Sequence, residues 1–428
     1  MGCLKISEKW VFAEDMDVCC EATAAQLSIM FGTQALTQNI NTWDSRKKDY
    51  IIVSTYPLAY WIANSWWRLC YEPRLSSNPP DFGWRMTHEL GSADHGFAWP
   101  RISFFPDGEV VCIAADVVSM PDQSVTYLPD SKIRALTGLD DFQNELSNFV
   151  LRTINRLREK NVAGDLCDLW EILQDEKSDP VCSEYRRIEA ALGYDSEEGP
   201  NELINDVISL KTAAGDGTIW ELSPFIGKQH EFCHELKQKS GIDGNPQLPN
   251  INVSSSESPW RRGVKLAHAL REHFKDDMVS TTELCDLLGI RYQDVEADNG
   301  NFNKRLPVAF ASTDNNQAYK FSFRRLRDTG KRFELARFIA DLYITKSLSQ
   351  PWLVSSDLAS ARQKVQRAFA AEFLCPIDRL LEVLNDDFSE ESQTEAAAHF
   401  QVSGLTVNSL LRNNGYLSAQ DSTFAYAG

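Results

Sequence analysis

Apolar residues recur every three or four positions in two stretches of the last third of the chain, and this spacing predicts two helices. In residues 331–344, Phe333, Ala336 and Ala340 lie on one stripe, and neighbouring apolar residues widen it until little of the helix is polar. A helix of this kind is mostly buried. The second stretch, residues 368–376, ends at a proline, which lacks the amide N–H needed to continue the helical hydrogen-bond ladder.

The first 125 residues show shorter patterns. Residues 49–54 are a β-branched run that predicts a strand, and residues 57–69 are predicted to form an amphipathic helix with a proline in its first turn. Residues 99–113 predict a hairpin that turns at Asp107-Gly108. Six of the eleven tryptophans fall between positions 43 and 99. We therefore expect an aromatic-rich α/β domain in residues 1–125.

The remaining patterns divide the chain further. Residues 126–239 are predicted to be helical, and between positions 140 and 206 they carry 17 acidic residues against 7 Lys and Arg, a net charge of −10. Residues 240–259 are rich in Gly, Pro, Asn and Ser, which is typical of a linker. Residues 260–428 are predicted to form a last, mainly helical domain. The expected fold class is therefore α+β.

Two motifs in the last domain resemble the core of the ImmA/IrrE family of zinc metallopeptidase domains. They are Lys331-Arg-Phe-Glu-Leu-Ala336 and Phe369-Ala-Ala-Glu-Phe-Leu-Cys-Pro376. Residues 393–415 resemble the helix-turn-helix that ends such proteins. The resemblance implies a zincin-like fold for residues 260–428.

The resemblance also implies where a zinc site would lie, but this chain has different residues at the metal-binding positions. The family's His-Glu-x-x-His falls on Arg337, Phe338 and Asp341, and the family's third ligand, a glutamate, falls on Val365. Zinc needs two histidines one helical turn apart and a carboxylate, and the glutamate beside the first histidine activates the bound water. We therefore expect a domain without catalytic residues and without a cofactor.

A literal His-Glu-x-x-His occurs elsewhere, at His230-Glu-Phe-Cys-His234. On a helix, both imidazoles would share one face and could bind zinc, with Glu231 as the catalytic base. Charged flanking residues are unusual for a buried catalytic helix. The third zinc ligand could be Glu235, His268 or His273, and the sequence does not decide between them. A zinc peptidase at this motif is the alternative hypothesis.

Positive charge collects beside the degenerate motif. From position 320 to 337, seven Lys and Arg oppose two acidic residues, a net charge of +5. Arg337 and Asp341 stand one turn apart and could form an ion pair that fills the lost metal site. Alternatively, Arg337 could line a cationic groove for an acidic peptide, such as residues 140–206 of the same chain. The other expected groove residues are Arg324, Arg325, Arg327, Lys331 and Arg332.

Composition narrows the functional classes. The 428 residues carry a net charge of −18, which disfavours broad affinity for nucleic acids, and no apolar run is long enough for a membrane span. Ten cysteines without a Cys-x-x-Cys pair indicate reduced thiols and a cytoplasmic location. We expect a non-catalytic, zincin-derived binding or regulatory protein of bacterial stress, mobile-element or defence systems, with a protein partner. A DNA-binding regulator is a further alternative, although Arg412 is the only Lys or Arg after position 389.

Overall fold

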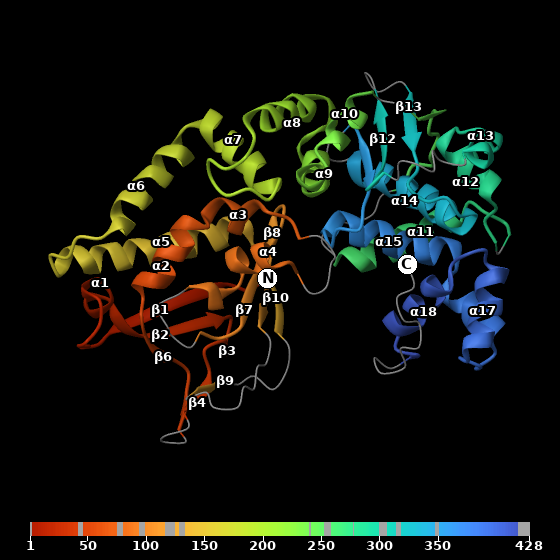
Figure 1. The fold of residues 1–428 in the computed structure, drawn as a ribbon. Coiled ribbons are helices and arrows are strands. Elements are labelled where there is room, and N and C mark those ends of the chain that lie inside the picture. Colours follow the sequence, from red (N-terminus) through yellow and green to blue (C-terminus); the bar gives the residue numbers. More distant parts are fainter. Residues whose placement is uncertain are drawn as a thin grey trace. The chain divides into compact units, whose positions relative to one another are not determined.

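The computed structural model describes residues 2–41, 46–74, 80–93, 99–115, 125–127, 133–238, 241–251, 258–276, 278–298, 306–313, 318–346 and 351–417. Helices and strands are mixed in this part of the chain, and the strands form four small antiparallel sheets (Figure 1). The predicted α+β class is confirmed. The zincin-like character of the last domain stays a prediction. None of the described helices is both long and apolar enough to cross a lipid bilayer.

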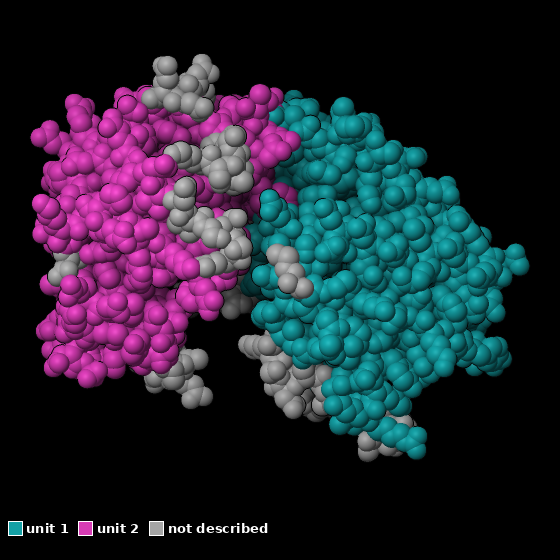
Figure 2. Space-filling view, turned by 180° about the vertical axis from the view of Figure 1, so that it is seen from behind, with its two compact units in different colours: residues 1–208 teal, residues 209–428 magenta. Residues whose placement is uncertain are grey.

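The chain divides into two compact units, Met1–Ile208 and Ser209–Gly428, which Figure 2 shows in two colours. The first unit contains the three sheets of the N-terminal half. The first sheet has the order β1 (Leu4–Trp10), β2 (Ala24–Phe31) and β3 (Gln34–Ala35), and β6 (Ile51–Ser54) also pairs with β2. The second has the order β10 (Ile133–Gly138), β8 (Val110–Ala115) and β7 (Ile102–Asp107). The third has the order β5 (Lys47–Lys48), β4 (Asn39–Asn41) and β9 (Val125–Tyr127).

Helices cover these sheets in the first unit, and the longest of them, α5, supplies one side of the core. Along α5, Phe142, Leu146 and Phe149 are buried at three- and four-residue spacing and join the same core as the strands. The helices are α1 (Val18–Ala22), α2 (Tyr56–Asn64), α3 (Trp66–Tyr71), α4 (Phe82–His88), the 3-10 turn η1 (Leu90–Ser92), α5 (Leu139–Glu159), α6 (Asp165–Ser178) and α7 (Pro180–Ala191). Helix α8 (Asn201–Ala214) spans the division between the units.

The second unit is built around one antiparallel sheet and a bundle of helices. The sheet order is β11 (Ile242–Gly244), β13 (Tyr319–Ser322), β12 (Ala309–Thr313) and β14 (Leu353–Ser355). The helices are α9 (Asp216–Lys228), α10 (Glu231–Gln238), α11 (Pro259–Arg271), α12 (Thr281–Leu288), α13 (Tyr292–Ala297), α14 (Asp328–Lys346), α15 (Ala361–Leu374), α16 (Ile377–Leu384), α17 (Glu390–His399) and α18 (Gly404–Asn413).

Helices α14 and α15 lie at the centre of the second unit, and α11 packs closely on α15. The close approach depends on Gly263 of α11. A Cβ atom added there would lie 2.4 Å from the carbonyl oxygen of Val365 on α15, which is well inside contact distance. The glycine thus permits the helix contact that holds α15 in place.

Several elements predicted from the sequence are confirmed. The hairpin of β7 and β8 turns at Gly108, whose φ of 69° suits a residue without a side chain. The two helices with apolar stripes are α14 and α15, and α15 ends just before Pro376. The predicted helix at 57–69 is instead two helices, because the chain departs from helical geometry at Ser65.

The packing groups the chain differently from the four predicted segments. Residues 133–208 pack into the first unit, while residues 209–238 belong to the second. Most of the predicted linker 240–259 is described, but positions 252–257 lie outside the described residues. The acidic stretch 140–206 forms α5, α6, α7 and the start of α8.

Candidate functional site

Helix α14 buries five charged side chains along with its apolar stripe. Lys331, Arg332, Glu334, Arg337 and Asp341 are all at most 4% exposed. Burying a charge is costly unless hydrogen bonds or an opposite charge compensate it. The partners of these side chains therefore define what the site can do.

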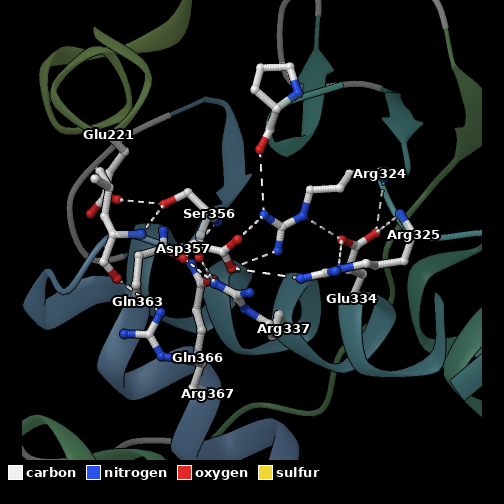
Figure 3. Close-up of polar contacts among 12 residues, drawn as sticks. Glu221, Arg324, Arg325, Glu334, Arg337, Ser356, Asp357, Gln363, Gln366 and Arg367 are labelled. Atoms are coloured by element: carbon white, nitrogen blue, oxygen red, sulfur yellow. Dashed lines mark hydrogen bonds and ion pairs between the residues drawn. The ribbon is translucent and has the colours of Figure 1, made fainter. Parts of the chain in front are cut away.

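Arg337 is surrounded by neutral oxygens. Its Nη2 donates to the carbonyl oxygen of Ser356 at 2.6 Å and to Oε1 of Gln363, and its Nε donates to Oε1 of Gln366 at 3.3 Å (Figure 3). Burial, together with the nearby positive charges of Arg367 and Arg324, lowers the pKa of Arg337 to about 9. The guanidinium is still a cation at neutral pH, and it offers no lone pair to a metal ion.

The two glutamines hold the end of β14 as well as Arg337. Their Nε2 atoms donate to the carbonyl oxygen of Val354, at 3.1 Å from Gln363 and 2.9 Å from Gln366. Since α15 places these residues one turn apart, both amides face the same part of α14. The guanidinium is thus fixed from two sides, by a strand end and by a helix.

The predicted ion pair between Arg337 and Asp341 is wrong. Asp341 is instead paired with Arg362 of α15, at 2.7 Å from Nε to Oδ1 and 2.6 Å from Nη2 to Oδ2. Asp341 also accepts the backbone N–H of Val354 at 2.9 Å. The bidentate geometry from α15 satisfies both carboxylate oxygens, which a residue one turn back on the same helix would not do as well.

A second set of charges lies at the other end of the network. Arg324 donates to Glu334 from Nε at 3.1 Å and to Asp357 from Nη1 and Nη2 at 2.6 and 2.9 Å. Arg325 lies 3.9 Å from each of the two carboxylates. Burial raises the pKa of Asp357, but the hydrogen bond and charge of Arg324 outweigh it and hold that pKa below its ordinary value, helped by Arg325 and Arg337.

The predicted cationic groove is not formed as an exposed surface. Lys331 donates to the carbonyl oxygens of Val295 and Asp298, and Arg332 donates to those of Val279 and Gln401. Arg337 is buried, and the Arg324 side chain is only 9% exposed. Of the six arginines and lysines expected in the groove, Arg325 and Arg327 are exposed. The charge count along the sequence overstated the exposed charge because most of these cations point into the fold.

The His-Glu-x-x-His motif lies at α10. His230 precedes the first helical residue, and Glu231 and His234 are exposed, while Phe232 and Cys233 are buried. Of the possible third ligands, His268 contacts Glu372 of α15 at 2.9 Å. Among the described residues, no group of three His, Cys, Asp or Glu side chains is close enough together to hold a metal ion.

The last two helices, α17 and α18, pack against each other and against the core of the second unit. Phe400, Val402 and Val407 at and after their connection are buried in that core. Arg412 lies in the last turn of α18. The packing gives the pair a structural role, and DNA binding stays a prediction.

In comparisons with known protein families, curated proteins and solved structures, no match to this chain was found. The candidate site therefore rests on its own geometry.

Sequence reasoning found the central arginine but missed most of its partners. These are Ser356, Gln363 and Gln366, and the wider network that was also missed contains Glu221, Asp357 and Arg362. One signal was available: Gln363 and Gln366 interrupt the apolar face of α15 at a spacing of three, and a buried charged helix nearby needs such partners.

Proposed function

We propose that this protein is a non-catalytic binding or regulatory protein whose second unit keeps a peptidase-like core without the metal chemistry. The observation that carries this proposal is the guanidinium of Arg337, 3% exposed, held by three protein oxygens at the position that the resemblance gives to the first metal ligand. A dication beside this group would meet like charge at low dielectric. The neighbouring Phe338 is fully buried and has no group that could take a proton from water.

The helix contact supports the same correspondence. The resemblance gives the third ligand position to Val365 of α15, and Gln363 and Gln366 on either side of it contact Arg337 of α14. The resemblance would put this contact where a zinc peptidase assembles its ligands. What occupies that place here is a positive charge with amide partners.

The proposed setting follows the resemblance by analogy. Such domains act on or sense protein partners in bacterial stress, mobile-element and defence systems, and we propose a protein or acidic peptide as the partner. A positively charged residue at the former metal position fits an anionic group better than the carbonyl that a zinc ion would polarise.

Metal analysis of the purified full chain tests this proposal. We expect less than a stoichiometric amount of zinc and no cleavage of peptide substrates after zinc is added. Zinc bound at one ion per chain, lost in His230→Ala and retained in His399→Ala, would overturn the proposal in favour of a peptidase at α10. The control is suitable because His399 is also exposed, at the end of α17.

A further inference from the structure

The charges around Asp357 do not balance. Three guanidinium groups, those of Arg324, Arg325 and Arg337, lie near two carboxylates, those of Glu334 and Asp357, and the charge of Arg367 also acts on Arg337, so positive charge is in excess. Figure 3 shows the Asp357 carboxylate among these three arginines.

Arg337 contributes one positive charge that no carboxylate pairs with directly. All three of its hydrogen bonds go to neutral oxygens, and no carboxylate of the described residues lies within ion-pair distance of it. Its Nη1 forms no hydrogen bond with the part of the chain that the structure describes. A buried cation without a counterion is unfavourable, and an anion nearby would relieve it.

The two carboxylates of the cluster differ in how firmly they are held. Glu334, with a side chain 2% exposed, also accepts the backbone N–H groups of Arg324 and Arg325 at 3.1 and 3.2 Å. Asp357 lies in the connection between β14 and α15, and 52% of its side chain is exposed. Asp357 can therefore leave the cluster without opening the core, whereas Glu334 cannot.

The contact between Asp357 and Arg324 has the form of oxyanion recognition. The two Nη atoms of Arg324 each donate to one oxygen of the Asp357 carboxylate. A guanidinium binds two oxygens of a phosphate group in the same bidentate way. Arg325, whose side chain is 54% exposed, stands beside it and can turn toward a bound group. The site is thus shaped for an oxyanion and is filled by one from the chain itself.

We propose that Arg324 and Arg325, beside the buried positive charge of Arg337, form an oxyanion-binding site in which the Asp357 carboxylate is a built-in occupant, displaced by a phosphate or carboxylate group of a protein partner. This inference rests on the proposed function and names the chemistry of the partner. In the absence of the partner, Asp357 holds the site closed and keeps its affinity for free anions low.

Calorimetric titration of the full chain with inorganic phosphate, and separately with acetate, tests the site at low ionic strength. We expect Asp357→Asn to bind phosphate at least tenfold more tightly than the unchanged chain, because the substitution removes the competing charge and keeps the shape. Adding Arg325→Gln should remove most of this gain. Arg379→Gln, a matched control in an exposed pair with Glu382 on α16, should change nothing. The tighter of the two anions identifies the partner group as phosphate or carboxylate.

The inference is overturned if folded Asp357→Asn binds phosphate no more tightly than the unchanged chain, or if the gain survives Arg325→Gln. If Asp357→Asn does not fold, thermal stabilisation by phosphate decides: equal stabilisation of the unchanged chain and Arg325→Gln overturns the site. Zinc is measured on the same samples. Stoichiometric zinc with an intact anion response would overturn the proposed function alone, and a zinc-free chain without the response would overturn only the oxyanion site.

Discussion

Both units of this protein bury arginines, and Arg68 in the first and Arg337 in the second are compensated differently. In the first unit, Arg68 of α3 pairs with Glu72 at 2.7 Å and with Asp195 at 3.0 Å. In the second unit, Arg337 of α14 is bound by a carbonyl and two amide oxygens. One buried cation has two acids, and the other has none within ion-pair distance among the described residues.

This difference separates a structural cluster from a candidate binding site. A buried charge that is matched within the chain gains nothing from a further ligand. A buried charge held only by neutral oxygens leaves a positive field that an incoming anion can use. Lys331 and Arg332 are also bound by neutral oxygens, and the charge of Arg337 acts on the exposed Asp357. The comparison thus supports the proposed site beside Arg337, and the following changes can break or sharpen it.

The largest effect is expected where a buried pair loses one member. Asp341→Ala removes the carboxylate that pairs with the Arg362 guanidinium, whose side chain is 10% exposed. We expect the free energy of unfolding to fall by about 3–5 kcal/mol, measured by urea unfolding. Asp294→Ala is the control: it breaks the exposed pair with Arg291 and should cost at most about 0.5 kcal/mol. A loss for Asp341→Ala as small as that of the control would contradict the pairing.

Removing the unmatched cation should cost less. Arg337→Gln gives up three hydrogen bonds but strands no opposite charge, so we expect the free energy of unfolding to fall by about 1–3 kcal/mol. Urea unfolding under the same conditions as for Asp341→Ala measures the difference. Equal losses in the two variants would mean that Arg337 is compensated as fully as Arg362, and the comparison between the units would fail.

The matched cluster of the first unit makes a prediction about pH. Burial raises the pKa of Glu72 to about 7, although Arg68 opposes this, and burial lowers the pKa of His88 to about 3. As the pH falls below 6.5, the unfolded histidine takes up a proton that the folded one does not, which lowers stability. Between 4.5 and 7, the folded Glu72 keeps a proton that the unfolded one loses, so a falling pH raises stability.

These two contributions have opposite signs and should nearly cancel between pH 6.5 and pH 5. His88→Gln leaves only the Glu72 contribution, so its free energy of unfolding should rise by about 2 kcal/mol as the pH falls across this range. Glu72→Gln should show a fall of similar size. Urea unfolding followed by tryptophan fluorescence measures both slopes. If the free energy of unfolding of both variants is as independent of pH as that of the unchanged chain, the pKa values of Glu72 and His88 are not shifted as described.

The smallest effect on stability is expected at the exposed edge of the oxyanion site. Arg325→Gln should change the free energy of unfolding by less than about 0.5 kcal/mol, because its side chain is 54% exposed and its two ion pairs are long, at 3.9 Å. Thermal unfolding measures this. Glu334→Gln is the buried counterpart and should cost clearly more. A large loss in Arg325→Gln would show that this arginine supports the fold and is not available to a ligand.

Several elements could be predicted from local pattern alone. Apolar spacing located α14 and α15, because burial of one face requires that spacing whatever the rest of the chain does. The Asp107-Gly108 turn was predictable because few residues adopt its backbone conformation. The same kind of reasoning overextended the helix at 57–69, since the backbone leaves helical geometry at Ser65, where no proline or glycine marks a break in the sequence.

The partners of the buried charges were decided only by tertiary structure. Sequence spacing placed Arg337 and Asp341 on one helix face, which is correct, and from this alone an ion pair followed. Packing of α15 on α14 brought Arg362 to Asp341 and the two glutamines to Arg337, across 21 to 29 positions of sequence. The sequence by itself determined that α14 carries charges into the core. Long-range contacts decide which of these charges are paired with an opposite charge and which are bound only by neutral oxygens. No local sequence pattern contains the geometry of those contacts.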